Sequence, residues 1–296
     1  MKKYIYQLIN KLGYRIENKQ NFLYKELEYL SKFDVKDENE LLFSSRKFIK
    51  KINQHYPNLK IKNHLNGFIL SLSDIEIYIE STEEIFIICE VFVEKDYNFV
   101  IKSKCIVLDV GANIGIASLF FSTIKYVEKI YSFEPVLDTI EQARINFSLN
   151  EKICKVSEIY NFGLGKNDRE ETFIFNKNIK GNTGVRGILS SSYANISQDV
   201  SEVNVKIKNV SNVFLDIKNN NPHKKIIVKM DCEGAEYEIF VNLAETGVIN
   251  HVDVFMIEWH DKGAKIIEDI LFNNDFSCFS RNLEINSGMI YAYKNN

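Results

Sequence analysis

The stretch IVLDVGANIGIASLFFSTIKYVEKIYSFE, residues 106–134, decides the fold. It opens with an apolar run at 106–110, of the kind that forms a buried strand. Gly111 and Gly115 then mark a turn into an apolar segment with helical spacing, and a second apolar run at 129–133 ends at Glu134. The order predicts a strand, a tight turn, a helix and a second, parallel strand.

The turn and the acid together predict a nucleoside site. Small residues at Gly111 and Gly115, with Asn113 between them, let the backbone approach a ligand closely. Glu134 lies nineteen residues after Gly115, and an acid at such a strand end can accept hydrogen bonds from both ribose hydroxyls. The alternative is structural, with the glycines making a turn and Glu134 ending a strand in solvent.

The identity of the nucleoside follows from the glycine pattern. A dinucleotide site needs G-x-G-x-x-G so that backbone amides reach a pyrophosphate, whereas this turn reads Gly111-Ala112-Asn113-Ile114-Gly115. Asp109 would repel a pyrophosphate and attract the positively charged end of S-adenosylmethionine (SAM). The pattern favours SAM over a nicotinamide cofactor, which stays the alternative.

Apolar runs at 155–160, 226–230 and 252–257 continue the alternation of strands and helices, as in a doubly wound α/β domain. Residues 1–66 have helix-like spacing and predict a helical N-terminal extension. Residues 67–296 form the predicted main domain, with its core at 104–296. Alternating apolar residues from 68 to 93 predict short strands before that core. Residues 172–215 predict a hairpin with a mobile loop that includes Gly184, Gly187 and Ser190-Ser191-Ser192.

Composition excludes several classes of protein. The chain has 296 residues and a formal net charge of −3 without a dense basic block, which argues against a nucleic-acid partner. Five scattered cysteines predict reduced, mostly buried thiols in a cytoplasmic protein. No run approaches the 18 apolar residues of a membrane span, although a basic N-terminal helix leaves peripheral membrane contact open.

Four further segments carry a family resemblance. They are Glu90-Val91-Phe92-Val93-Glu94-Lys95-Asp96-Tyr97, Phe133-Glu134-Pro135, residues 228–236 (VKMDCEGAE) and Glu258-Trp259-His260. Over residues 85–293 the chain resembles the FkbM-type methyltransferases, a branch of the class I SAM-dependent enzymes. The resemblance implies a Rossmann-like sheet of seven strands with helices on both faces and one antiparallel strand at Gly288 to Tyr293. It also implies methyl transfer, often to a hydroxyl of a surface glycan or a secondary metabolite.

Acidic groups follow two later strands of the predicted sheet. Asp231 and Glu233 come after the run at 226–230, and Glu258 and His260 after the next run. A carboxylate or imidazole there can take the proton of a sugar hydroxyl, so these four are the candidate catalytic residues. Capping of a helix by the first pair, or a structural His260, are the alternatives. Asp231, Glu233 and His260 could instead bind a divalent ion, but metal-free base catalysis is preferred.

Two residues after the third strand are candidate adenine contacts, Asn161 and Phe162, although Phe162 also suits a core position. Gly181-Asn182-Thr183-Gly184 suits either a ligand contact or a hairpin turn. The predicted activity is SAM-dependent O-methylation of a sugar in capsule or lipopolysaccharide synthesis. Methylation of a secondary metabolite or another small molecule is the first alternative. A nicotinamide-dependent oxidoreductase and a non-catalytic SAM-binding accessory protein are the others. The sequence predicts neither the acceptor nor the oligomeric state.

Overall fold

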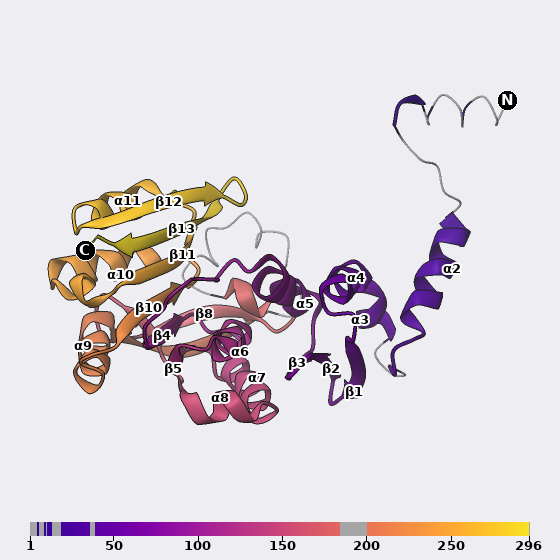
Figure 1. Cartoon of the computed structure of the whole chain (residues 1–296), viewed down its shortest axis with the longest axis horizontal. Coiled ribbons are helices and arrows are strands. Elements are labelled where there is room, and N and C mark those ends of the chain that lie inside the picture. The colour runs from indigo at the N-terminus through magenta and orange to yellow at the C-terminus, as the bar shows by residue number, and fades with distance from the viewer. Residues whose placement is uncertain are drawn as a thin grey trace.

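The computed structural model describes residues 19–35, 39–183 and 200–295, together with Ile5, Ile9 and residues 11–13. Its centre is a seven-stranded sheet in the order β12-β13-β11-β10-β4-β5-β6 (Figure 1). The strands are β4 (Cys105–Val110), β5 (Val127–Phe133), β6 (Ser157–Tyr160), β10 (Lys225–Met230), β11 (Val254–His260), β12 (Phe276–Asn282) and β13 (Ser287–Lys294). Strand β13 is antiparallel to both of its neighbours, which confirms the expected topology.

Helices cover both faces of this sheet because its central strands are apolar on both sides. In β4, Cys105 and Val107 pack into one core cluster and Ile106 and Leu108 into the other, as the two-residue period of a strand requires. The first cluster includes side chains of α6 (Ile116–Thr123), α7 (Leu137–Ser148) and α8 (Glu151–Val156). The second includes those of α9 (Val210–Asn220), α10 (Glu236–Glu245) and α11 (Lys265–Phe272), with a 3-10 turn at Val248–His251.

The N-terminal part is only partly helical. Helices α2 (Lys19–Leu30), α3 (Asn39–Ser44) and α4 (Arg46–His55) precede an antiparallel sheet of β1 (Lys60–His64), β2 (Gly67–Leu72) and β3 (Ile75–Ile79). Strand β1 therefore begins inside the stretch predicted to be helical. The edge of β3 is held by α7, where Asn146 accepts a hydrogen bond from the Tyr78 amide at 2.7 Å. Figure 1 shows this small sheet beside α7.

The prediction of strands up to residue 93 is wrong beyond β3. Residues Thr82–Ile88 form helix α5, which continues as a π-helix over Cys89–Glu94. Ser81 caps α5 by accepting from the Glu84 amide, and the buried Ile85, Ile88 and Phe92 recur at helical spacing. The local cap outweighs the β propensity of the isoleucines and valines.

The predicted hairpin is confirmed by β8 (Arg169–Asn176), which pairs antiparallel with β9 (Val200–Asn209). The short β7 (Gly163–Gly165) pairs parallel with β9, and a 3-10 turn occupies Lys180–Asn182. The loop expected at Gly184, Gly187 and Ser190-Ser191-Ser192 lies outside the described residues. The third strand of the main sheet begins at Ser157, later than the predicted residue 155, because α8 extends to Val156.

All five cysteines are unpaired, but only Cys89 and Cys105 are buried, so the prediction of mostly buried thiols is wrong. Within the described part of the chain, every helix is too short or too polar to span a membrane.

Candidate functional site

A cavity opens where β4, β5, β10 and β11 end. Six residues predicted for the site line it: Gly111, Asn113, Glu134, Asp231, Glu233 and Glu258. Parallel strands bring their carboxyl ends to one edge of the sheet, and ligands of open α/β folds bind there. Helix α5, the π-helix and the 3-10 turn at Lys180–Asn182 contribute the opposite wall. Distant segments therefore meet around one pocket.

The two glycines of the first turn have different structural roles. Gly111 has φ +76°, and a Cβ there would lie 1.7 Å from the Asp231 carbonyl oxygen, so only glycine fits between the ends of β4 and β10. Gly115 has φ +85°, and a Cβ there would lie 2.5 Å from the Phe147 ring. Gly111 lines the cavity, whereas Gly115 is not among the lining residues and allows α6 to pack on α7.

Glu134 is a buried carboxylate held by backbone donors. Its Oε2 accepts from the Asn113 amide at 3.0 Å, and its Oε1 accepts from the Val136 amide at 2.9 Å. Burial raises the pKa of Glu134 to about 7, against the lowering effect of those two hydrogen bonds. Each carboxylate oxygen can accept more than one hydrogen bond, so Glu134 can also accept from ligand hydroxyls.

Two polar atoms of the cavity wall lack a partner among the described residues. They are Oδ1 of Asn113 and Oγ1 of Thr183, both buried. Buried polar groups are nearly always hydrogen-bonded in folded proteins. A ligand with hydrogen-bond donors, such as the amino acid end of SAM, fits this pair and the nearby Glu134.

Asp109 is not among the residues that line the cavity. Its side chain accepts a hydrogen bond from Ser118 at 2.6 Å and lies 3.3 Å from Nζ of Lys229. Lys229 does line the cavity, and it donates to the Gly111 carbonyl at 2.6 Å. Asp109 thus balances the charge of a buried lysine that holds the turn; direct contact with a ligand stays a prediction.

Asp231 and Glu258 meet at the adjacent ends of β10 and β11, beside Tyr97. The hydroxyl of Tyr97 lies 3.2 Å from Oδ2 of Asp231 and 3.4 Å from Oε2 of Glu258, and can donate to either. Burial, followed by the nearby Asp231 carboxylate, raises the pKa of Glu258 to about 8. The ionised form of such a carboxyl is a stronger base than an ordinary glutamate.

His260 lies behind these two acids, with only 2% of the residue exposed. Its Nδ1 is 3.0 Å from Oε1 of Glu236, while its Nε2 is 3.6 Å from Glu233 and 3.7 Å from Glu258. Burial lowers the pKa of His260, but the hydrogen bond to Glu236 and the nearby Glu233 raise it overall to about 10. His260 is absent from the cavity lining. It therefore contacts Glu233, Glu236 and Glu258 but does not reach the pocket itself.

Asn161 and Phe162 support the site from outside the cavity lining. The Asn161 amide donates to the carbonyls of Glu134 and Pro135 at 3.1 and 2.9 Å, which fixes the end of β5. The Phe162 ring packs against Phe133, 5.6 Å between centroids. Gly163 and Leu164, the next residues along the chain, do line the cavity.

Sequence reasoning gave no role to several lining residues: Glu83, Glu90, Tyr97, Lys180 and Lys229. Glu90, Tyr97 and Lys229 belong to segments that carry the family resemblance, which by itself assigns them no role. Burial, together with the neighbouring Glu258 and Asp231 carboxyls, raises the pKa of Glu90 to about 9. The sequence predicts a strand around Glu90, whereas this residue lies in the π-helix that continues α5. The pattern therefore does not indicate that Glu90 reaches the cavity.

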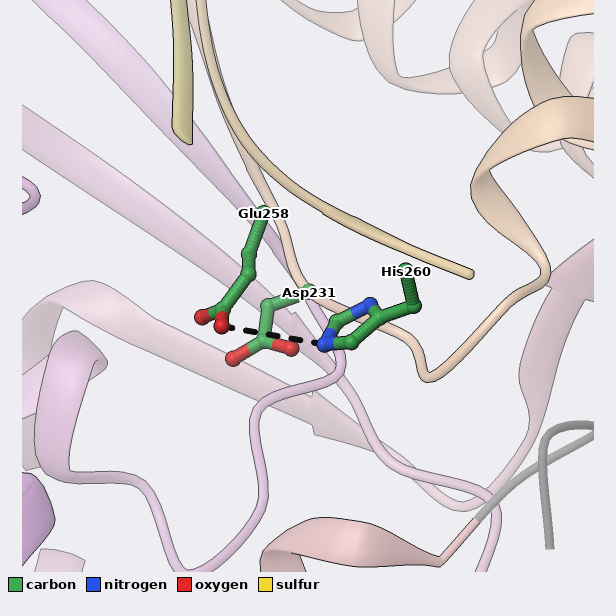
Figure 2. Close-up of side chains that lie close together, drawn as sticks. All are labelled: Asp231, Glu258 and His260. Atoms are coloured by element: carbon green, nitrogen blue, oxygen red, sulfur yellow. Dashed lines mark ion pairs between the residues drawn. The ribbon is translucent and has the colours of Figure 1, made fainter. Parts of the chain in front are cut away.

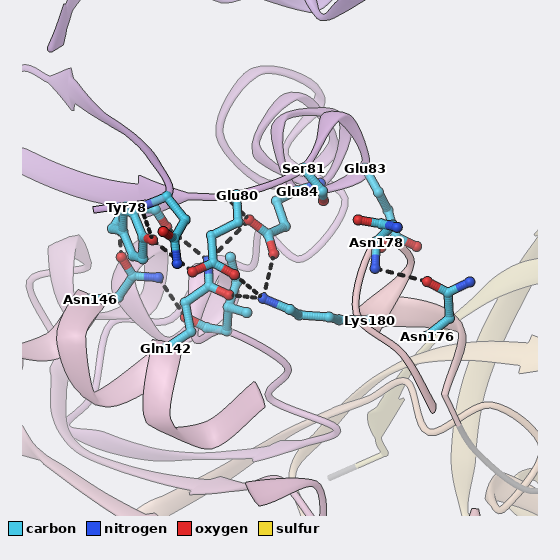
Figure 3. Close-up of polar contacts among 12 residues, drawn as sticks. Tyr78, Glu80, Ser81, Glu83, Glu84, Gln142, Asn146, Asn176, Asn178 and Lys180 are labelled. Atoms are coloured by element: carbon cyan, nitrogen blue, oxygen red, sulfur yellow. Dashed lines mark hydrogen bonds and ion pairs between the residues drawn. The ribbon is translucent and has the colours of Figure 1, made fainter. Parts of the chain in front are cut away.

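Lys180 joins the 3-10 turn to the N-terminal part of the chain (Figure 3). Its Nζ lies 2.9 Å from Oε2 of Glu80 and 3.2 Å from Oε1 of Glu84, and it donates to Gln142. The adjacent Gly181 amide donates to Glu83 at 3.3 Å. These contacts hold the 3-10 turn against the cavity.

Comparison with known proteins identifies a family and two relatives. The model of the family described as "Methyltransferase FkbM domain" matches residues 109–278. The chain is 24% identical to the AMB antimetabolite synthetase AmbE of Pseudomonas aeruginosa, over 58% of its own length and 9% of that protein. It is 27% identical to Methyltransferase 1 of Beauveria bassiana, over 53% of its own length and 66% of that protein. It thus spans less than two thirds of either relative.

Among solved structures, an rRNA methylase from Streptococcus thermophilus matches 67% of this chain and 90% of its own, with a TM-score of 0.38 and 10% identity. So distant a likeness adds no weight to the assignment. The family model does, because it covers more than half of the chain and includes the cavity residues from Gly111 to Glu258. The chain belongs to the FkbM methyltransferase family.

Proposed function

We propose that the protein binds SAM and methylates a hydroxyl group of a sugar in the biosynthesis of a surface glycan, such as capsule or lipopolysaccharide. The observation that carries the proposal is the buried Glu134 carboxylate beside the Gly111 turn, in the cavity that Asp231 and Glu258 also line. Glu134 would hold the ribose hydroxyls. Oδ1 of Asn113 and Oγ1 of Thr183, which have no partner among the described residues, would accept from the amino acid portion.

The acidic end of the cavity suits the chemistry of this transfer. SAM, when bound, supplies an electrophilic methyl group on a positively charged sulfur. Asp231, Glu258 and Glu90 line that part of the pocket, where Lys229 approaches Asp231 at 3.7 Å. The positive sulfur of a bound SAM would favour the ionised forms of these carboxyls. Asp231 or Glu258 would orient the acceptor hydroxyl and take its proton as the methyl group moves. His260 would act through the acids, since it does not line the pocket.

A second acceptor class is favoured by one relative. AmbE is named as an antimetabolite synthetase, which supports a small secondary metabolite as the alternative to a sugar. Incubation with methyl-labelled SAM separates the two, using nucleotide-linked sugars and glycan fragments in one panel and amino-acid-derived metabolites in the other. Label in the first panel, located on oxygen by NMR, supports the proposal. Label only in the second panel, or on nitrogen, overturns the sugar O-methylation.

We also propose that the protein works in the cytoplasm, which its five unpaired cysteines support. A glycan precursor is the proposed partner, and nucleic acid is not, given the net charge of −3. Fractionation of cells that express the tagged chain tests this location.

A further inference from the structure

Three side chains from two adjacent strand ends face one another beside the cavity (Figure 2). Asp231 directly follows β10, while Glu258 and His260 belong to β11, two residues apart and therefore on one face of the strand. One ligand atom from each residue lies within 4.8 Å of the other two. We propose that Asp231, Glu258 and His260 bind a divalent transition-metal ion.

Each of the three residues offers one ligand atom toward the other two. Tyr97 lies next to Oδ2 of Asp231 and Oε2 of Glu258, and Lys229 approaches the same Oδ2 at 3.7 Å. Among the described residues, Oδ1 of Asp231 makes no hydrogen bond or ion pair. Nε2 of His260 lies 3.7 Å from Oε1 of Glu258 and 3.6 Å from Oε1 of Glu233, which can approach the same ion. The donor set is thus two carboxylate oxygens and one imidazole nitrogen.

The imidazole is oriented as a metal ligand usually is. Nδ1 of His260 lies 3.0 Å from Oε1 of the fully buried Glu236, which directs Nε2 toward Glu258. A carboxylate on the far nitrogen of a ligating histidine fixes the ring and increases its basicity. Glu236 is itself held, because it accepts from the amides of Cys232 and Gly234. This support is independent of the two acids.

The spacing suits a small cation after a modest adjustment. Bonds of about 2.1 Å place donors about 3 Å apart when adjacent and about 4.2 Å apart when opposite. Donors that lie within 4.8 Å of one another need to move only on the order of 1 Å to reach these separations. Mixed carboxylate and imidazole ligands favour Mn²⁺ or Zn²⁺ over Ca²⁺.

The open coordination positions would face the cavity, because Asp231 and Glu258 line it and His260 lies behind them. An acceptor hydroxyl that coordinates there would be oriented, and its pKa would be lowered. This use of the ion rests on the proposed methyl transfer. Binding of the ion does not, so the two can be tested separately.

The test measures Mn²⁺ binding to the chelator-treated full chain, without SAM or acceptor. Binding is detected as the loss of the free-ion signal in electron paramagnetic resonance. We expect one ion per chain and a nitrogen coupling from His260 in spin-echo spectra. Glu258→Gln, Asp231→Asn and the orienting Glu236→Gln should each weaken binding about 10- to 100-fold. Zn²⁺ should displace the bound Mn²⁺.

The exposed Glu284 and His223 provide matched controls, and Glu284→Gln and His223→Ala should leave binding unchanged. Circular dichroism establishes which variants fold. For His260→Ala, the measurement is the loss of the nitrogen coupling in the spin-echo spectra. Absence of saturable Mn²⁺ binding overturns the proposal. So does binding that survives both Asp231→Asn and Glu258→Gln, because the ion would then lie elsewhere. Neither result bears on SAM binding.

Discussion

The backbone amide of Asn113 donates a 3.0 Å hydrogen bond to Oε2 of Glu134. This contact joins the turn after β4 to the end of β5, and so fixes the two sides of the proposed nucleoside site relative to each other. The same carboxylate holds the Val136 amide through its other oxygen. Glu134 therefore shapes the site as well as offering acceptors to a ligand.

Glu134→Gln tests this double role. The amide keeps the size of the side chain, but its NH₂ group would face one of the two backbone donors. We expect SAM affinity to fall about 10- to 100-fold, the effect of losing one or two charge-assisted hydrogen bonds. Calorimetric titration with SAM measures it. Glu141→Gln, on the exposed face of α7, is the control. Equal SAM affinity in both variants would mean that Glu134 does not contribute to SAM binding.

Tyr97→Phe tests the acidic end of the pocket. The ring remains in the core, but the hydroxyl that donates to Asp231 or Glu258 is lost. We expect kcat to fall about tenfold, as one lost hydrogen bond allows, while SAM affinity changes less than about twofold. Steady-state kinetics and calorimetry separate the two effects. Tyr293→Phe, exposed on β13, should match the wild type; a Tyr97→Phe variant that also matches it would contradict the assignment.

Lys180→Met tests the attachment of the 3-10 turn. The change leaves the buried Glu84 without its cation, which should lower the free energy of unfolding by about 3–5 kcal/mol. It should also raise the KM for SAM, because Gly181 and Thr183 line the cavity. Urea denaturation and kinetics are the measurements.

The exposed Lys152 supplies the control Lys152→Met, which should leave both quantities unchanged. The double variant Lys180→Met/Glu84→Gln should regain part of the stability. A double variant no more stable than the single one would mean that Lys180 does not act through Glu84.

Glu90 makes stability depend on pH. Its pKa is about 9 in the fold, against 4.5 for an ordinary glutamate. A carboxyl with a raised pKa binds its proton more tightly when folded, so this contribution to stability falls as pH rises from about 4.5 through about 9. Glu90→Gln should flatten that decline and add at least about 1 kcal/mol at pH 8. The exposed Glu170→Gln is the control; an unchanged pH slope in Glu90→Gln would contradict the prediction.

The sheet and its first turn could be predicted because their signals are local. Residues 106–134 contain two apolar runs, two glycines and an acid in order, and β4, α6 and β5 follow that order. The acids after β10 and β11 could be placed at the same edge, since parallel strands align their carboxyl ends. Glu258 and Asp231 indeed share a pocket wall.

The opposite wall could not be predicted, because it depends on contacts between distant segments. Lys180 contacts Glu80 and Glu84, which lie about a hundred positions earlier in the chain. The spacing of apolar residues along the sequence does not predict which distant residues form such pairs. The isoleucine-rich stretch after Ser81 suits a strand as well as a helix, and its cap decided the outcome. The placement of His260 behind Glu258 follows from the alternation of side chains in β11 and from Glu236, which sequence reasoning did not pair with it.

Calorimetric titration of the full chain with SAM and with NAD⁺ tests the central claim most directly. The claim is that the cavity at the ends of β4, β5, β10 and β11 is a SAM site. We predict one SAM per chain with micromolar affinity, weakened in Glu134→Gln, and no heat of binding with NAD⁺. Binding of NAD⁺ alone, or SAM binding that Glu134→Gln leaves unchanged, would contradict it.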